Sequence, residues 1–248
     1  MIGRRGLLAG AGVVLAAAAP EVPLATRPVA RLDTPWWRRR HADKLAEIRG
    51  RRVDLVWLGD SITQNWERPD FQPAWRHYYG DRRAVNLGFS GDATCHLLWR
   101  LRNGEVAGIA PHAAVVLIGA NNLGVLHWPT AEDVAGIVAV VDETRRRLPQ
   151  TRVLLLGVLP SERSAWVSET TLAINSALAV RYRGSREVSF MDLAPLFAPG
   201  GRLDRGLFLD PVLRPPAPPL HPTAAGQARM AAAIEPKLAE LLGEAPRA

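Results

Sequence analysis

The sequence predicts an α/β protein in which a five-stranded parallel sheet lies between two layers of helices, a three-layer α/β/α sandwich. Three observations lead to this fold class. Short apolar segments alternate with helical patterns along the chain, 48% of the 248 residues are hydrophobic, and no internal repeat interrupts the alternation. Because a chain of this length and composition can bury one sizeable core, we expect a single globular domain.

Five segments have the length and composition of buried strands. They lie at residues 53–58, 84–87, 113–118, 152–156 and 188–191. The clearest of them are almost wholly apolar, which is typical of strands that are covered on both faces. Helical patterns lie at residues 42–49, 93–101, 131–148, 166–183 and 223–242. Strands separated by helices indicate a parallel sheet, because parallel neighbours need a crossover connection.

The first 35 residues have the features of a targeting segment and a linker rather than those of a folded domain. Arg4 and Arg5 precede an uncharged stretch that ends in small residues, so we interpret residues 1–19 as a signal peptide of the twin-arginine type. An uncleaved membrane anchor is the alternative. Residues 20–35 are rich in proline and predict a linker or surface strap, and the globular domain spans residues 36–248. We therefore expect an exported protein, periplasmic or extracellular, with no stable membrane insertion after cleavage.

Composition and motifs exclude several classes of function. The net charge of +7 comes from basic clusters scattered along the chain, and with no nucleic-acid-binding motif we expect no nucleic-acid partner. A lone cysteine, Cys95, cannot form an internal disulfide. The histidines have no partners at metal-ligand spacing, so we expect no metal site. P-loop, dinucleotide-binding and Gly-x-Ser-x-Gly motifs are missing from the mature chain, and we expect no cofactor.

Reactive side chains follow the expected strands at the point where each strand ends. Ser61 follows the first strand, Gly88 the second and Asn121 the third, and His221 ends the long loop after the fifth. Because the carboxyl ends of parallel strands share one edge, these groups should meet there. Serine needs a base to become a nucleophile, and His221 suits that task. The N–H groups of Ser61 and Gly88 and the Asn121 amide would then bind the oxyanion.

Each of these residues also has a structural interpretation. Asp60 and Ser61 could simply cap a helix, His221 could be a surface histidine, and Asn121 could form a turn. His96, in the second loop, is a weak rival base. The arrival of all four groups from different loops at the same edge of the sheet favours the catalytic interpretation.

The four segments resemble the signature blocks of the SGNH/GDSL hydrolases, with Ser61, Gly88, Asn121 and His221 in the family's order. The stretch 86–105, Asn-Leu-Gly-Phe-Ser-Gly-Asp-Ala-Thr-Cys-His-Leu-Leu-Trp-Arg-Leu-Arg-Asn-Gly-Glu, is similar to that of platelet-activating-factor acetylhydrolase catalytic subunits and their bacterial relatives. The resemblance implies a flavodoxin-like SGNH hydrolase fold over residues 36–248. It also implies hydrolysis of short acyl esters, often acetyl esters, without metal or cofactor.

The sequence departs from the family's pattern at the catalytic acid. Members of the family carry Asp three residues before the histidine, where this chain has Pro218. Three explanations compete: Asp210 reaches back across the Pro-rich loop, a backbone carbonyl orients His221, or activity is lost. We favour Asp210, and Asp192 is a further candidate that could instead cap a turn or helix.

We therefore expect a serine esterase that removes short acyl groups from a small-molecule or polysaccharide ester through an acyl-enzyme on Ser61. Two alternatives remain. An O-acyltransferase would use the same site with a sugar hydroxyl as acceptor. A non-catalytic carbohydrate-binding protein would keep the fold without the reaction.

Overall fold

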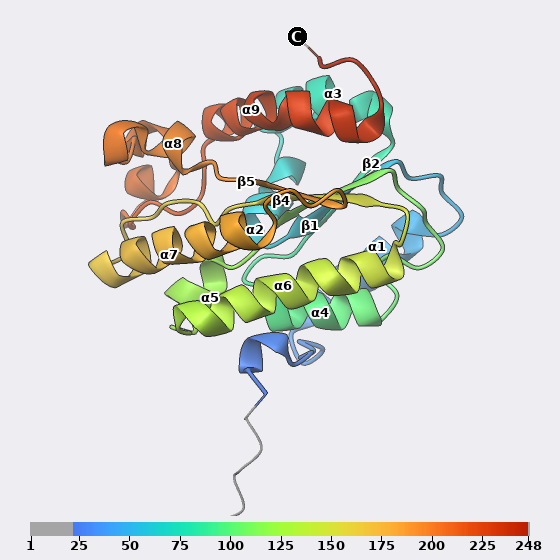
Figure 1. The fold of residues 1–248 in the computed structure, drawn as a ribbon, viewed down its shortest axis with the longest axis horizontal. Helices are drawn as coiled ribbons and strands as arrows, with labels where there is room; N and C mark the ends of the chain where they lie inside the picture. The colour runs from blue at the N-terminus through green and yellow to red at the C-terminus, as the bar shows by residue number, and fades with distance from the viewer. Residues whose placement is uncertain (1–21, 248) are drawn as a thin grey trace, which may run out of the picture.

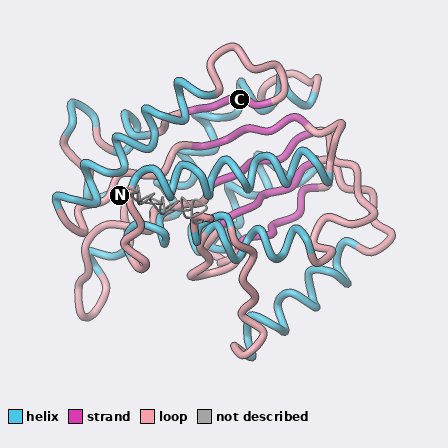
Figure 2. Tube along the Cα trace, turned by 60° about the horizontal axis from the view of Figure 1, so that its bottom comes forward, coloured by secondary structure: helices cyan, strands magenta, loops and turns pink. Residues whose placement is uncertain are grey.

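The computed structural model describes residues 22–247. The expected signal peptide, residues 1–19, therefore lies outside the described residues. Five strands form one sheet, namely β1 (Leu55–Gly59), β2 (Ala84–Gly88), β3 (Ala113–Leu117), β4 (Arg152–Leu156) and β5 (Val188–Met191). All neighbouring strands are parallel and their order is β2-β1-β3-β4-β5. The predicted five-stranded parallel sheet is confirmed (Figure 2).

Helices cover both faces of the sheet, as the sandwich requires (Figure 1). On one face lie α1 (Pro35–Ile48), α4 (Thr94–Arg102), α5 (Ala120–Gly124), α6 (Thr130–Arg147) and α7 (Ala165–Arg181). On the other lie α3 (Gln72–Tyr79), α8 (Ala194–Phe197) and α9 (Ala224–Leu242). The short helix α2 (Ser61–Gln64) directly follows β1.

The strands are buried on both faces because alternate side chains point to opposite layers. In β1, Val56 and Leu58 join the core under α4 and α6, whereas Leu55 and Trp57 join the core under α3 and α9. Each fully buried aliphatic side chain contributes about 1.5–3 kcal/mol relative to exposure. The sheet is therefore a rigid base for the loops at its carboxyl edge.

Several helices differ from the expectation, and the short helices α2, α5 and α8 were not expected. The first helix begins at Pro35 rather than near residue 42, because proline suits the first turn of a helix, where its missing N–H is not needed. Helix α3 was not expected at all. Tyr79 is its only buried side chain, and its eight residues are fewer than the roughly 11 over which a helical period can be recognised in a sequence.

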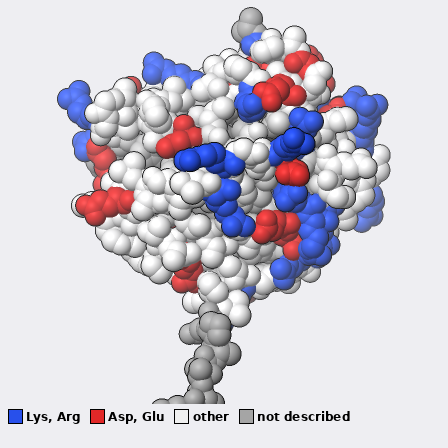
Figure 3. All heavy atoms as spheres, in the orientation of Figure 1, with Lys and Arg blue, Asp and Glu red and all other residues white. Residues whose placement is uncertain are grey.

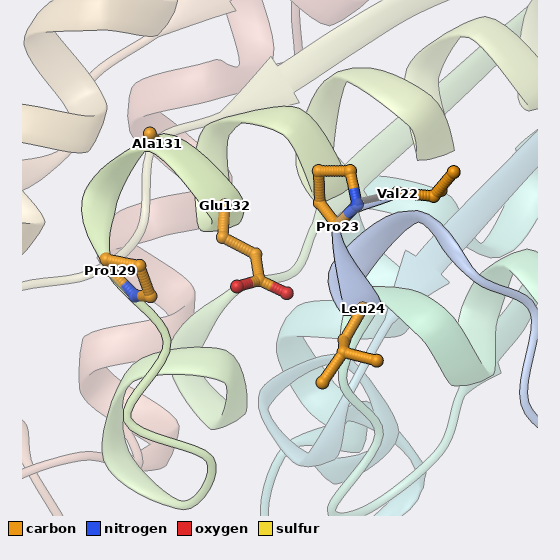
Figure 4. Close-up of a pocket in the computed structure, with 6 residues that line it drawn as sticks. All are labelled: Val22, Pro23, Leu24, Pro129, Ala131 and Glu132. Carbon is orange, nitrogen blue, oxygen red and sulfur yellow. The ribbon is translucent and has the colours of Figure 1, made fainter. Parts of the chain in front are cut away.

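Residues 22–34 run across the outside of α4 and α6. A single 3-10 turn, η1 (Leu24–Thr26), places Ala25 in full burial between these helices. The N–H of Ala25 donates to Glu132 Oε1 at 3.1 Å, and Thr94 Oγ1 donates to the Ala25 carbonyl at 2.9 Å. Figure 4 shows Glu132 between the start of α6 and this turn. The segment is thus bound to the domain by specific contacts.

Charged side chains of both signs are mixed on the face shown in Figure 3. The basic side chains there lie among acidic ones. Ion pairs occur elsewhere in the chain as well as near the surface, for example between Lys44 and Glu67, 2.7 Å apart. Mixed charge of this kind creates little long-range field. Among residues 22–247, no helix combines the length and the apolar character needed to cross a membrane.

Candidate active site

Ser61 lies at a sharp turn from β1 into α2. The turn depends on Gly59, because a Cβ at that position would collide with the carbonyl oxygen of Leu117 in the neighbouring strand. Asp60 caps the helix by accepting the Ile62 N–H at 3.0 Å. The structural role expected for the Asp60-Ser61 pair therefore belongs to Asp60, which leaves the Ser61 hydroxyl free for another partner.

The Ser61 hydroxyl contacts the imidazole of His221, although the two residues are 160 positions apart. Ser61 Oγ and His221 Nε2 are 2.9 Å apart, and His221 Nδ1 lies 2.7 Å from Asp210 Oδ1. A proton on Nδ1 satisfies the carboxylate and leaves the Nε2 lone pair to accept from the hydroxyl. The arrangement can therefore take a proton from the serine and stabilise the imidazolium that results.

Asp210 reaches the imidazole because its segment pairs with the segment that carries His221. The Leu209 N–H donates to the His221 carbonyl at 2.7 Å, and Phe208 and Pro222 form an antiparallel bridge. The second carboxylate oxygen, Oδ2, accepts the N–H groups of Leu220 at 2.8 Å and His221 at 2.6 Å. Burial raises the pKa of Asp210, but these hydrogen bonds and that from the imidazole outweigh it and hold the pKa below its ordinary value.

The rival groups have other partners. Asp192 Oδ1 accepts the Ala194 N–H at 2.9 Å and the Asn175 amide at 3.1 Å, so it caps the start of α8. His96 Nδ1 accepts the Ala93 N–H at 2.9 Å at the start of α4. The histidine therefore satisfies the first turn of its own helix. The partner of His221 Nδ1 is a carboxylate rather than a backbone carbonyl.

The expectation for Gly88 needs a correction. Its N–H donates to Asn86 Oδ1 at 2.8 Å, and the Asn86 amide in turn donates to the Thr63 carbonyl at 2.9 Å. Gly88 is buried, and a Cβ on it would collide with the backbone nitrogen of Gln64. Its missing side chain makes room for α2 rather than for substrate, and its N–H is not available to an oxyanion.

A second glycine of the same loop has the exposure that Gly88 lacks. Gly91 is exposed, has φ +74°, and its N–H has no acceptor within residues 22–247. Asn121, 7% exposed, lies beside it, because its side-chain amide donates to the Asp92 carbonyl at 2.9 Å. An amide group carries two hydrogens, so one remains for a ligand. Sequence reasoning missed Gly91, although a glycine after a polar residue in a loop is a common sign of positive φ.

Asn122, next to Asn121, has a purely structural environment. Its amide donates to Asp133 Oδ1 at 2.7 Å and to Thr94 Oγ1 at 2.9 Å, and its oxygen accepts the Thr94 N–H at 3.0 Å. These bonds hold α5 between α4 and α6. The position of Asn121 follows from them.

The buried carboxyl of Asp60 and the half-buried guanidinium of Arg163 lie near the imidazole. Burial raises the pKa of Asp60 to about 6, while the Ile62 N–H and the charges of His221 and Arg163 oppose the rise. Arg163 donates to the Ala120 carbonyl at 2.9 Å, and burial lowers its pKa. The Asp60 carboxyl is therefore only partly ionised near pH 6.

The site has no cluster suited to a metal ion within residues 22–247. Cys95 is buried below the second loop, and burial raises the pKa of its thiol to about 11. The thiol is therefore protonated at neutral pH and a poor nucleophile.

Comparison with known proteins agrees with this geometry. The model of the GDSL-like lipase/acylhydrolase family matches residues 57–229, which contain all the side chains described above from Asp60 to His221. The chain belongs to this family. The predicted resemblance is confirmed, and the protein is an ester-hydrolysing enzyme. The non-catalytic binding protein is therefore no longer an alternative.

Curated relatives of this acylhydrolase include acetylhydrolase subunits. The bovine platelet-activating factor acetylhydrolase IB subunit alpha1 is 34% identical over 163 residues, 65% of this chain and 67% of the relative. The rat subunit alpha2 is 33% identical over 159 residues, 63% of this chain and 66% of the relative. The matched part of the chain thus spans about two thirds of the relatives' length.

Solved structures share the fold of this acylhydrolase. A GDSL-like lipase from Bacteroides thetaiotaomicron superposes with a TM-score of 0.65 at 18% identity, covering 82% of this chain and 97% of that one. A carbohydrate esterase family 3 protein from Talaromyces cellulolyticus has a TM-score of 0.56 at 20% identity, covering 77% and 98%. A carbohydrate acetylesterase family member from Sinorhizobium meliloti has a TM-score of 0.58 at 16% identity, covering 77% and 99%.

Proposed function

We propose that the protein is a serine esterase that hydrolyses short acyl esters, acetyl esters above all, through an acyl-enzyme on Ser61. The observation that carries the proposal is the line of contacts from Ser61 Oγ through His221 to Asp210 at the carboxyl edge of the sheet. The same constellation of serine, histidine and acid recurs on unrelated folds, where it performs acyl transfer.

In the first half of the reaction, His221 Nε2 takes the hydroxyl proton of Ser61 while Oγ attacks the acyl carbon. The tetrahedral oxyanion accepts hydrogen bonds from the backbone N–H groups of Ser61 and Gly91 and from the Asn121 amide. The carbon–oxygen bond to the alcohol then breaks, and the imidazolium returns its proton to the alkoxide. Asp210 stabilises the imidazolium throughout.

In the second half, water takes the place of the alcohol. His221 removes a proton from the water as it attacks the acyl carbon, and the second oxyanion uses the same three donors. Release of the carboxylic acid returns the proton to Ser61 Oγ. An acyltransferase would use a sugar hydroxyl instead of water, and product analysis with added oligosaccharide distinguishes the two reactions.

The substrate class rests on the relatives and on the expected export. Two of the solved relatives are described as carbohydrate esterases, and the curated ones as acetylhydrolases. We therefore favour an O-acetyl group on an envelope or extracellular polysaccharide. Acetate release from acetylated polysaccharide tests the substrate, and the N-terminal sequence of protein recovered outside the cytoplasm tests the export.

Replacement of the nucleophile is the direct test of the mechanism. We expect Ser61→Ala to lower the turnover of p-nitrophenyl acetate by about 10⁴-fold or more, since removal of a triad member leaves only the oxyanion donors and binding. Ser176→Ala, which changes an exposed serine of α7, is the matched control and should keep wild-type turnover. Full activity of Ser61→Ala would refute the role of Ser61.

A further inference from the structure

The loop that carries Gly91 is held by a side chain from the N-terminal segment. Arg31 Nη1 donates to the Ser90 carbonyl at 3.1 Å and to Asp92 Oδ1 at 3.1 Å. It lies 3.3 Å from where a Cβ on Gly91 would be. The guanidinium therefore contacts all three residues of the loop 90–92. Because glycine at positive φ is conformationally permissive, this loop needs such external contacts to keep one geometry.

Asp92 connects the contact with Arg31 to the interior. Its carboxylate is fully buried; Oδ1 also accepts the Trp37 indole N–H at 2.8 Å, and Oδ2 accepts Arg100 Nε at 2.8 Å. Its backbone carbonyl accepts the Asn121 amide at 2.9 Å. One residue thus links the N-terminal segment to both oxyanion donors outside α2, the Gly91 N–H and the Asn121 amide.

Arg100 extends the link to the strand that precedes Ser61. Its guanidinium is fully buried and donates to the Gly59 carbonyl at 3.1 Å and to the Leu87 carbonyl at 3.0 Å. It also pairs with Glu105. The ends of β1 and β2 and the loop 90–92 are therefore held in one charged network. Arg31 is its outermost member, with a side chain 25% exposed.

The segment that carries Arg31 has its own attachments to the domain. The Val29 N–H donates to the Cys95 carbonyl at 3.0 Å, Ala25 is buried under α6, and the Arg31 guanidinium stacks 5.5 Å from the Trp36 ring. These contacts leave Arg31 little freedom. The segment also precedes residues 57–229, the part of the chain that the family model matches.

We propose that Arg31 is a positioning residue of the esterase reaction: it fixes the loop 90–92 so that the Gly91 N–H and the Asn121 amide are directed at the oxyanion. The inference rests on the proposed function, because it assumes those two donors. Donors contribute most when their orientation is set before the charge develops. A guanidinium is suited to this task, since a single Nη group carries two hydrogens in one plane and can donate to a carbonyl and a carboxylate at once.

The test compares three variants with the wild type in p-nitrophenyl acetate hydrolysis. We expect Arg31→Ala to lower kcat by about 10-fold to 100-fold with KM nearly unchanged, less than the roughly 10²–10³-fold lost when a donor itself is removed. Arg31→Lys should recover only part of kcat. Arg38→Ala is the matched control, because the exposed Arg38 holds the same segment through the Leu32 carbonyl at 3.0 Å but belongs to no contact with the loop 90–92. It should keep wild-type kcat.

Added guanidinium ion separates positioning from folding. Because the Arg31 side chain is partly exposed, guanidinium chloride well below denaturing concentration should restore part of the kcat of Arg31→Ala and leave Arg38→Ala unchanged. Wild-type kcat in Arg31→Ala, an equal loss in Arg38→Ala, or a loss that guanidinium fails to reverse would each overturn the inference. If one of these three outcomes is found while Ser61→Ala is inactive, only the role of Arg31 is refuted and the proposed function stands. An active Ser61→Ala would refute the proposed function itself.

Discussion

At the scale of single residues, the carboxylate of Asp210 has two tasks. One oxygen contacts the imidazole of His221, and the other accepts two backbone N–H groups of the same segment. The side chain thus holds both the ring and the backbone that carries it. An asparagine here would place its NH₂ group either against the imidazole N–H or against the two backbone N–H groups, so that a donor would face a donor in both orientations.

We therefore predict that Asp210→Asn lowers kcat strongly. In serine proteases the corresponding change costs about 10⁴-fold, and a loss of at least about 10²-fold is expected here. Asp204→Asn is the matched control, since Asp204 is exposed and only caps a short turn through the Gly206 N–H at 3.1 Å. Steady-state kinetics on p-nitrophenyl acetate measures both variants. Equal, small effects would remove Asp210 from the mechanism.

At the scale of elements, the position of α5 depends on a buried carboxyl of α6. Asp133 is fully buried and accepts the Asn122 amide through Oδ1, while its Oδ2 has no partner in the described part of the chain. Burial raises the pKa of Asp133 to about 8. The nearby Glu132 charge adds to this rise, and the hydrogen bond from the Asn122 amide opposes it. The protonated acid is therefore the form that the fold prefers.

This pKa predicts how stability depends on pH. An unfolded chain releases the Asp133 proton near pH 3.8 and the folded chain near pH 8, so the folded state holds the extra proton between these values. The free energy of unfolding should therefore fall as pH rises through this window. Asp133→Asn mimics the protonated acid, and we expect it to flatten this slope and to stabilise the protein by at least about 1 kcal/mol at pH 8.

Urea unfolding at a series of pH values measures the effect. Asp142→Asn, which changes an exposed carboxyl of the same helix, is the control. A slope in Asp133→Asn that equals the wild-type slope would show that Asp133 does not titrate in this window.

At the scale of the whole molecule, the last helix is tied to the far edge of the sheet by a buried ion pair. Arg82, just before β2, donates to both carboxylate oxygens of Glu235 in α9 at 2.7 and 2.6 Å, and each side chain is 2% exposed. Arg82 also pairs with Glu244, nearer the surface, at 2.6 Å. These contacts connect residues more than 150 positions apart, and they set α9 against α3.

We predict that Glu235→Gln destabilises the protein by about 3 kcal/mol, because it leaves the buried charge of Arg82 with only one partner. Lys237→Ala removes an exposed ion pair with Glu240 on the same helix and should change stability by less than about 1 kcal/mol. Chemical denaturation gives both values. Two equal changes would contradict the importance assigned to burial.

Local pattern was enough to predict the sheet and most of its helices. The five strands are short and apolar, and helical patterns separate them. Composition and periodicity alone therefore predict the alternation of strands and helices along the chain. Ser61 and Asn121 could be placed in the same way, since each follows closely on the end of a strand, whereas His221 lies at the end of a long loop. Residues of this kind are predictable because neighbours in the chain decide their environment.

The partners of those residues depend on segments that are distant in the chain. Asp210 contacts His221 because Phe208 pairs with Pro222. The Gly88 N–H donates to the side chain of Asn86 and is therefore not available to a ligand. The loop that contains Gly91 is held by Arg31. None of these contacts has a periodic or local signature. Each exists only after the chain has closed around the sheet, because hydrogen bonds and ion pairs select among partners by distance and direction, which sequence order does not record.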